Sequence, residues 1–291
     1  MHPMKPMTSS HHNHHPHPGR WLLAALLMAL PLGAGCGGAT GGSATATPDS
    51  PTTAAAPQAP HVIGYSRIVD LTHPLYDEMA FWPGGVPFRK IQLVGYDQGY
   101  LLHKFELGEN VGTHVDAPRH FVEGAPGVDA LPLQQLVVPA VVIDVRDQVA
   151  QNPDYQLGAA DISAWEAKNG PIPAGALVLL STGWHQRFAE PSRYANQDAD
   201  QVMHFPGYGP DSAKLLIERD VVGIGIDTLS LDHGPSPDFA THRLMLAAGK
   251  YQVENLTNLD QLPTTGATVV IAVLPVRDGS QAQARAFAFV P

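Results

Sequence analysis

Cysteine is almost absent from this chain of 291 residues, in which Cys36 is the only one. A single cysteine excludes an intramolecular disulfide and a cysteine-rich metal site, so any metal must be held by His, Asp, Glu or Asn. Charged residues are also scarce, at 15% of the chain, whereas hydrophobic residues make up 44%. This composition supplies enough apolar surface for a substantial buried core.

Positive charge is scarce as well. Lys and Arg number 17 against 27 Asp and Glu, which gives a formal net charge of -10, and no basic cluster is visible. A nucleic-acid partner is therefore not expected. No glycine-rich loop stands at a predicted strand-to-helix turn, and no Gly-x-Ser-x-Gly motif occurs. Dinucleotide and P-loop sites are thereby excluded, and a serine hydrolase is disfavoured.

The chain also lacks an apolar run long enough to span a bilayer. Trp21–Ala34 is apolar over roughly 14 residues, compared with the about 20 that a membrane-spanning helix needs. Only Lys5 and Arg20 are charged before Cys36. This pattern predicts a secretory signal peptide over residues 1–36, and hence an exported protein of the bacterial cell envelope, in the periplasm or at the cell surface.

The small residues before Cys36 resemble a lipobox, Leu32-Gly33-Ala34-Gly35-Cys36. In a lipobox the cysteine is acylated, so Cys36 is predicted to carry a lipid that is the protein's only contact with the membrane. The leucine stands one place further from the cysteine than is usual, and ordinary signal-peptidase cleavage without an anchor is the alternative.

Residues 37–60 are rich in Gly, Ala, Thr and Pro and show no apolar periodicity, which predicts a flexible linker. Residues 61–291 are predicted to form one compact mixed α/β domain, because short β-type runs alternate with fewer helical ones. The predicted strands are 67–71, 90–94, 101–107, 140–145, 177–181, 221–226, 252–256, 269–275 and 284–290. The predicted helices are 160–168, 210–218 and 241–248.

Chemistry is concentrated in the segment from Glu109 to His120, ENVGTHVDAPRH. If this segment is extended, alternate side chains share a face, and Asn110, His114 and Asp116 converge with room left by Gly112. An imidazole and a carboxylate converging on one point favour a divalent metal ion. The alternative is chance, since His-x-Asp occurs often without a metal. Asp227 and Asp232 also attract attention, and turn geometry accounts for them; the alternative is that Asp232-His233-Gly234 borders the substrate pocket.

This segment resembles the His-x-Gly-Thr-His-x-Asp-x-Pro-x-His motif of the cyclase family of metal-dependent hydrolases, which includes kynurenine formamidase and isatin hydrolase. Ordered matches to the family extend over nearly the whole predicted domain. They are VDLTHPL (69–75), FWPG (81–84), STGW (181–184), HFPG (204–207), GIDTLSLD (225–232), TH (241–242) and VENL (253–256).

The resemblance implies a role for each matching residue. The metal ligands would be His114, Asp116, His242 and Glu254, holding Zn²⁺ or Mn²⁺. His120 would be the catalytic acid/base, and Trp82 would line the substrate pocket. The sequence departs from the family at Asn110, which stands where the family has its first histidine ligand. A centre with one well-held ion is therefore expected, with Asn110 as a doubtful ligand.

The predicted function is hydrolysis of an amide, formamide or cyclic amide bond of a small molecule, with water activated by the metal. Two alternatives stay open: an exported binding protein that has lost catalysis, and a hydrolase or dehydratase of a carbonyl compound without an amide bond. The resemblance also implies a homo-oligomer, because the family often assembles as dimers or larger complexes.

Overall fold

The computed structural model describes residues 62–291. The predicted signal peptide (1–36), the linker (37–60) and Cys36 lie outside the described residues. The strands are β1 (Arg67–Asp70), β2 (Arg89–Val94), β3 (Leu102–Glu106), β4 (His114–Asp116), β5 (Val137–Asp144), β6 (Gln156–Leu157), β7 (Leu177–Ser181), β8 (Gly207–Tyr208), β9 (Gly223–Ile226), β10 (Tyr251–Glu254), β11 (Thr268–Val273) and β12 (Gln281–Val290).

The described helices are short. The α-helices are α1 (Arg146–Gln151), α2 (Ala159–Asn169), α3 (Pro191–Ala195), α4 (Pro210–Glu218) and α5 (Ala240–Ala247). Six 3-10 helices accompany them: η1 (Tyr96–Gln98), η2 (Pro118–His120), η3 (Val128–Ala130), η4 (Leu133–Gln135), η5 (Trp184–Arg187) and η6 (Leu259–Gln261). Within residues 62–291, no helix is long and apolar enough to cross a membrane.

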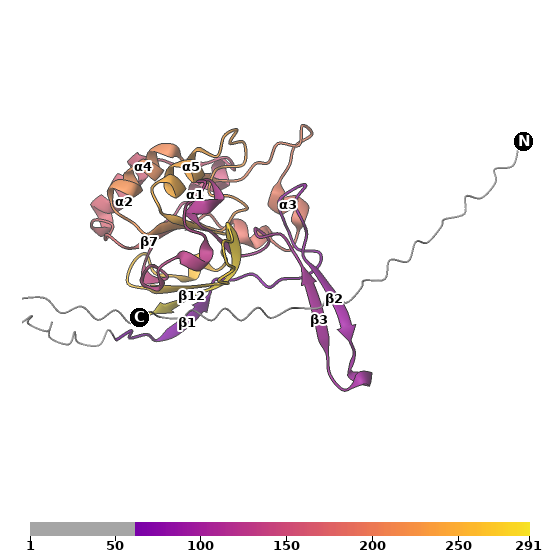
Figure 1. The fold of residues 1–291 in the computed structure, drawn as a ribbon. Helices are drawn as coiled ribbons and strands as arrows, with labels where there is room; N and C mark the ends of the chain where they lie inside the picture. The colour runs from indigo at the N-terminus through magenta and orange to yellow at the C-terminus, as the bar shows by residue number, and fades with distance from the viewer. Residues whose placement is uncertain (1–61) are drawn as a thin grey trace, which may run out of the picture. The chain divides into compact units, whose positions relative to one another are not determined.

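The main sheet closes on itself as a barrel. Its strand order is β1-β12-β11-β5-β7-β9-β10-β4, and β4 pairs with β12 as well as with β10. Strands β5, β7, β9 and β10 run parallel, and the remaining pairs are antiparallel. Strand β1 lies outside the closed ring, paired with β12 only, and both appear at the lower edge of the body in Figure 1.

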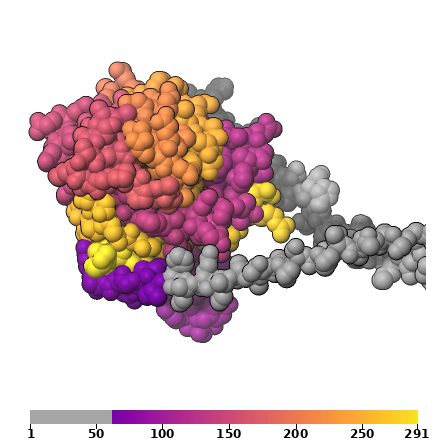
Figure 2. Space-filling view, turned by 90° about the vertical axis from the view of Figure 1, so that its left-hand side faces the viewer, coloured from indigo at the N-terminus to yellow at the C-terminus, as the bar shows by residue number. Residues whose placement is uncertain are grey.

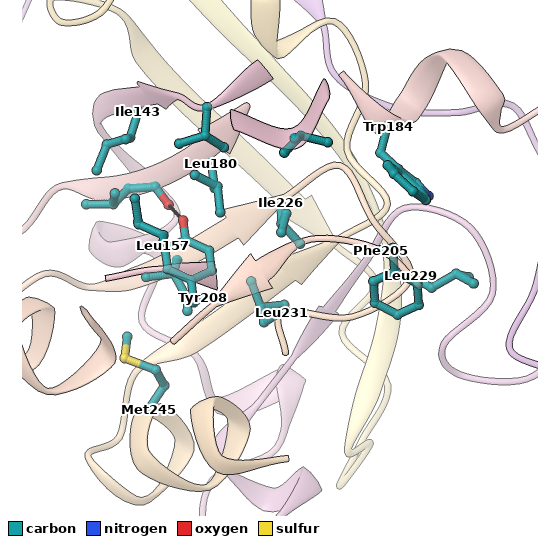
Figure 3. Packing of buried hydrophobic residues seen from close by; sticks show 14 of the residues in the cluster. Ile143, Leu157, Leu180, Trp184, Phe205, Tyr208, Ile226, Leu229, Leu231 and Met245 are labelled. Atoms are coloured by element: carbon teal, nitrogen blue, oxygen red, sulfur yellow. Dashed lines mark hydrogen bonds between the residues drawn. The ribbon is translucent and has the colours of Figure 1, made fainter. Parts of the chain in front are cut away.

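Two apolar cores lie on the two faces of this barrel. Along β7, Leu177 and Leu179 face one core and Val178 and Leu180 the other, because successive side chains of a strand alternate. The first core fills the barrel with residues such as Val115, Val253, Ala286 and Ala288. The second lies between the outer face and the helices, and it includes Tyr208, Ile226 and Met245 of α5 (Figure 3).

Strands β2 and β3 form a separate two-stranded sheet that projects from the body (Figure 1). Figure 2 shows the start of the described chain, in indigo, against the yellow C-terminal strand, which agrees with the pairing of Arg67 with Val290.

The predicted single mixed α/β domain is confirmed, and each of the nine predicted strands and three predicted helices overlaps an observed one. Strand β4 was not predicted, because it has three residues and no apolar run. The short strands β6 and β8 and the helices α1 and α3 were also missed.

Gly223 of β9 allows two strands to approach closely. A Cβ atom at this position would lie 2.4 Å from the carbonyl oxygen of Tyr251 in β10, and backbone cannot move aside as a side chain can. We expect Gly223→Ala to lower the free energy of unfolding by about 1–3 kcal/mol, which urea denaturation would measure. At Gly64 a Cβ would meet nothing within 4 Å. Gly64→Ala should therefore change the free energy of unfolding by less than about 0.5 kcal/mol. Equal unfolding midpoints for the two variants would contradict the packing argument.

Candidate metal centre and pocket

Four ionisable side chains converge on the outer face of the barrel. His114 and Asp116 lie two residues apart on β4 and share a face, and Glu254 of β10 is paired directly with His114. His242 comes from α5, which packs over this part of the sheet. All four side chains are buried, with no more than 5% of any side chain exposed.

The two carboxylates lie between the two imidazoles. His114 Nε2 is 3.3 Å from Asp116 Oδ1 and 3.2 Å from Glu254 Oε2. On the other side, His242 Nε2 is 3.3 Å from Asp116 Oδ2 and 3.1 Å from Glu254 Oε1. One ligand atom each from His114, Asp116 and Glu254 lie within 4.8 Å of one another. His242 contacts both carboxylates from the opposite side, so we count it as the fourth donor.

Each imidazole is held so that its Nε2 atom faces this cluster. The Nδ1 atom of His114 is 2.8 Å from the carbonyl oxygen of Gly112, and that of His242 is 2.6 Å from Asp232 Oδ2. With Nδ1–H donating to these acceptors, the lone pair of Nε2 is free to bind a metal. Such a support of ligand histidines by a carbonyl or carboxylate is usual in metal sites.

The donors fit a divalent ion. His114 Nε2 and Asp116 Oδ2 are buried, and although each has an ionisable neighbour at 3.2–3.3 Å, neither atom makes a hydrogen bond among the described residues. Unpaired polar atoms in the interior are costly, and a cation coordinated by them removes that cost. Two imidazoles and two carboxylates are ligands that Zn²⁺ and Mn²⁺ both accept.

The electrostatics of the cluster agree with this fit. Burial alone lowers the pKa of His114, but its contacts with Asp116 and Glu254 outweigh burial and raise this pKa to about 10. The pKa of His242 is raised well above its ordinary value by Asp116, Asp232 and Glu254, again against the effect of burial. Without a cation, two imidazolium protons therefore balance the two carboxylates. A divalent ion would bring the same charge and replace both protons.

A cavity of about 250 Å³ opens beside the cluster. His242, Glu254 and Gln281 supply polar atoms to it, and Trp82, Phe121 and Phe239 supply aromatic walls. The residues that line it are Trp82, Asn110, His120, Phe121, Leu229, Ser230, Phe239, His242, Glu254 and Gln281. The ring centroids of Trp82 and Phe239 are 5.9 Å apart, and those of Phe121 and Phe239 are 6.1 Å apart.

His120 lines this cavity without joining the donor cluster. It ends the 3-10 helix η2, which begins at Pro118, and its ring centroid lies 6.2 Å from that of His242. Burial lowers the pKa of His120, and the negative charge of Asp116 only partly opposes this. His120 is therefore a neutral imidazole at pH 7, able to accept a proton.

The structure brings together in this region the predicted metal-site, catalytic and substrate-binding residues, but by a different backbone path; they are Trp82, Asn110, His114, Asp116, His120, His242 and Glu254. The prediction of an extended chain from Asn110 to Asp116 is wrong, because Gly112 has a φ of 71° and turns the chain before β4 begins. A Cβ at Gly112 would also lie 2.5 Å from Leu75 Cδ2. Asn110, the doubtful ligand, lines the cavity beside the donor cluster.

Asp232 was explained by turn geometry in the sequence, and this interpretation is wrong. Its Oδ2 atom accepts from the backbone N–H of His242 at 3.1 Å as well as contacting Nδ1, and its Oδ1 accepts from Thr241 N–H at 2.8 Å. Gln281, Phe121 and Phe239 were not predicted either. The position of Phe121 directly after the motif could have indicated that it lines the cavity. The sequence around Gln281 and Phe239 gave no such indication.

A sequence profile of the family described as "Putative cyclase" matches residues 69–233. This chain belongs to the cyclase family. The isatin hydrolase of Roseibium aggregatum is 37% identical over 193 residues, covering 64% of this chain and 73% of that protein. The kynurenine formamidase of Bacillus mycoides is 27% identical over 223 residues, covering 76% of this chain and 96% of that protein. The solved structure of isatin hydrolase A from Ralstonia solanacearum is 36% identical and covers 77% of this chain and 92% of that one, with a TM-score of 0.74.

The cyclase-family resemblance seen in the sequence is thus confirmed. His242 and Glu254 lie beyond the residues that the family profile matches, yet the fold places them against His114 and Asp116.

The contact between Asp232 and His242 is testable through metal affinity. In Asp232→Asn the amide NH₂ can replace the oxygen that faces Nδ1. An NH₂ group facing Nδ1 would favour the His242 tautomer that carries its hydrogen on Nε2, the atom that should bind the ion. We expect affinity for Zn²⁺ or Mn²⁺ to fall by about 10–100-fold, measured by competition with a chelator. Asp238→Asn makes the same change at an exposed position of the same loop, and its affinity should equal that of the unaltered chain. Unchanged affinity in Asp232→Asn would remove His242 from the centre.

Proposed function

We propose that this protein hydrolyses an amide C–N bond of a small aromatic molecule, with His120 as acid/base and a divalent ion held by His114, Asp116, His242 and Glu254. The observation that carries the proposal is the position of His120, which shares a cavity with His242 and Glu254 but stands outside the donor cluster. Ligation and proton transfer can therefore be carried by different residues.

The chemistry divides between the ion and the chain. When bound, a divalent ion lowers the pKa of a coordinated water from 15.7 toward about 7 and polarises a carbonyl group. His120, neutral at pH 7, accepts the proton of the attacking water at an imidazole nitrogen. It then returns this proton to the departing nitrogen as the C–N bond breaks, so that an amine and a carboxylic acid are formed, and the acid loses its proton to solvent at pH 7.

The walls of the cavity favour an aromatic substrate. Trp82, Phe121 and Phe239 surround a volume of about 250 Å³, which suits a one- or two-ring compound and excludes a folded polypeptide. Aromatic rings pack well against one another in offset or edge arrangements. The names of the relatives agree, since isatin and formylkynurenine both combine an aromatic ring with an amide bond.

The role of His120 is tested by His120→Ala. We expect metal content to be almost unchanged while turnover of an aryl formamide or a lactam falls by about 10²–10⁴-fold, which is the usual contribution of a positioned acid/base. Metal analysis and a substrate assay on the same preparation would measure both. His103→Ala, on the projecting sheet, is the matched control and should retain full activity.

Three outcomes would change the proposal. Loss of the metal in His120→Ala would make His120 a ligand. Turnover of non-amide carbonyl compounds alone would favour the second enzyme class. If a small aromatic molecule binds the metal-loaded protein without turnover, the protein is a binding protein.

We also propose that the β2–β3 sheet joins two copies of the chain. Neither strand packs extensively against another described helix or strand, and an isolated two-stranded hairpin is marginally stable in water. The exposed apolar side chains on and beside it include Val86, Leu93, Tyr96, Tyr100 and Phe105, each at least 55% exposed. A second copy related by a two-fold axis would cover both sheets at once.

The double variant Leu93→Glu/Leu102→Glu tests this assembly. We expect the unaltered chain to have twice the monomer mass by light scattering after size-exclusion chromatography, and the variant to have the monomer mass, because charges on an apolar interface are costly to bury. Leu133→Glu, at a position 76% exposed outside this sheet, should remain dimeric. A monomeric unaltered chain would contradict the proposal.

A further inference from the structure

Asp116 stands between two glutamine side chains in one row across the sheet. Gln252 of β10 and Gln281 of β12 are each paired directly with Asp116 of β4. Directly opposed residues of antiparallel strands point to the same face, with Cβ atoms about 4.5–5.5 Å apart. An amide group therefore lies beside the carboxylate of Asp116 on each side.

The two amides are satisfied very differently. Gln281 Nε2 donates to Asp116 Oδ1 at 2.7 Å. Gln252 is completely buried, and neither its Nε2 nor its Oε1 has a hydrogen-bond partner among the described residues. Asp116 Oδ2, the oxygen that Gln281 does not contact, lies 3.3 Å from His242 Nε2 but makes no hydrogen bond among the described residues. Three unpaired buried atoms thus belong to one pair of opposed residues.

Buried polar groups that lack a protein partner usually bind an internal water, which needs two to four polar partners. The amide nitrogen and oxygen of Gln252 and the Oδ2 atom of Asp116 are three polar atoms on one face of the sheet. The amide of Gln252 makes no direct hydrogen bond with Asp116 Oδ2. A single bridging water would use the donor of Gln252 and the acceptor of Asp116 at nearly the strength of a direct bond.

We propose that Gln252 is a positioning residue of the metal centre, which donates through one buried water to Asp116 Oδ2. Together with Gln281 it holds the carboxylate from both sides and fixes the direction in which its oxygens face the ion. The inference rests on the metal centre of the proposed function, and is independent of the substrate and of His120.

Gln252→Met tests whether Gln252 positions Asp116 or is a buried amide that plays no part in metal binding. Methionine has a similar shape and no hydrogen-bonding groups to satisfy, so the melting temperature of the metal-free protein should be unchanged or higher. The affinity for Mn²⁺ or Zn²⁺, measured on the full chain by chelator competition, should nevertheless fall by about 10–100-fold. Gln252→Leu and Gln281→Met should lose affinity in the same way.

Gln283→Met is the matched control on the same strand as Gln281. Its amide donates to the carbonyls of Gly108, Glu109 and Val111 and does not contact Asp116. We expect a lower melting temperature with unchanged metal affinity, the opposite of Gln252→Met. Unchanged affinity in Gln252→Met, or an equal loss in Gln283→Met, would overturn the inference. Failure of the unaltered chain to bind either ion would instead overturn the metal centre itself.

Discussion

The burial of two carboxylates side by side is the constraint on which the rest of this structure depends. Asp116 and Glu254 come from adjacent strands and face each other inside the protein, where two negative charges cannot remain without compensation. The imidazoles of His114 and His242 stand at either end, and each is fixed by an acceptor behind it. The arrangement is stable as a set of two protonated histidines and two carboxylates, or with a divalent ion in place of the protons.

A further layer of hydrogen bonds supports these side chains from the direction of the core. The carbonyl of Gly112, which orients His114, also accepts from Asn255 Nδ2 at 3.2 Å, and Asn255 Oδ1 accepts from the hydroxyl of Tyr194 at 2.9 Å. Thr113 Oγ1 donates to the carbonyl of Asn255 at 2.6 Å. The turn that carries His114 is thereby tied to the segment that follows Glu254, although more than 140 residues separate them.

Residue types and apolar runs were enough to predict most strands and helices, because the parallel strands are buried on both faces and read as continuous apolar segments. The convergence of His114 with Asp116 could also be predicted from their spacing. The closing of the barrel could not, since it depends on β4, whose three residues carry no strand signal. For a related reason the sequence did not predict the roles of Asp232, Gln252 and Gln281. A neutral amide, or a carboxylate in a turn, acquires a role only when a partner from a distant part of the chain is folded against it.

The double pairing of β4 also sets an order of assembly. Strand β4 (His114–Asp116) lies between β10, which begins at Tyr251, and β12, which begins at Gln281, so both of its partners come much later in the sequence. A ribosome that has made only the first half of the domain has released His114 and Asp116, but nothing to hold them in place. The four donors are all present only once Glu254 has been synthesised, and Asp116 gains its hydrogen bond from Gln281 later still, so ion capture must follow the synthesis of β10.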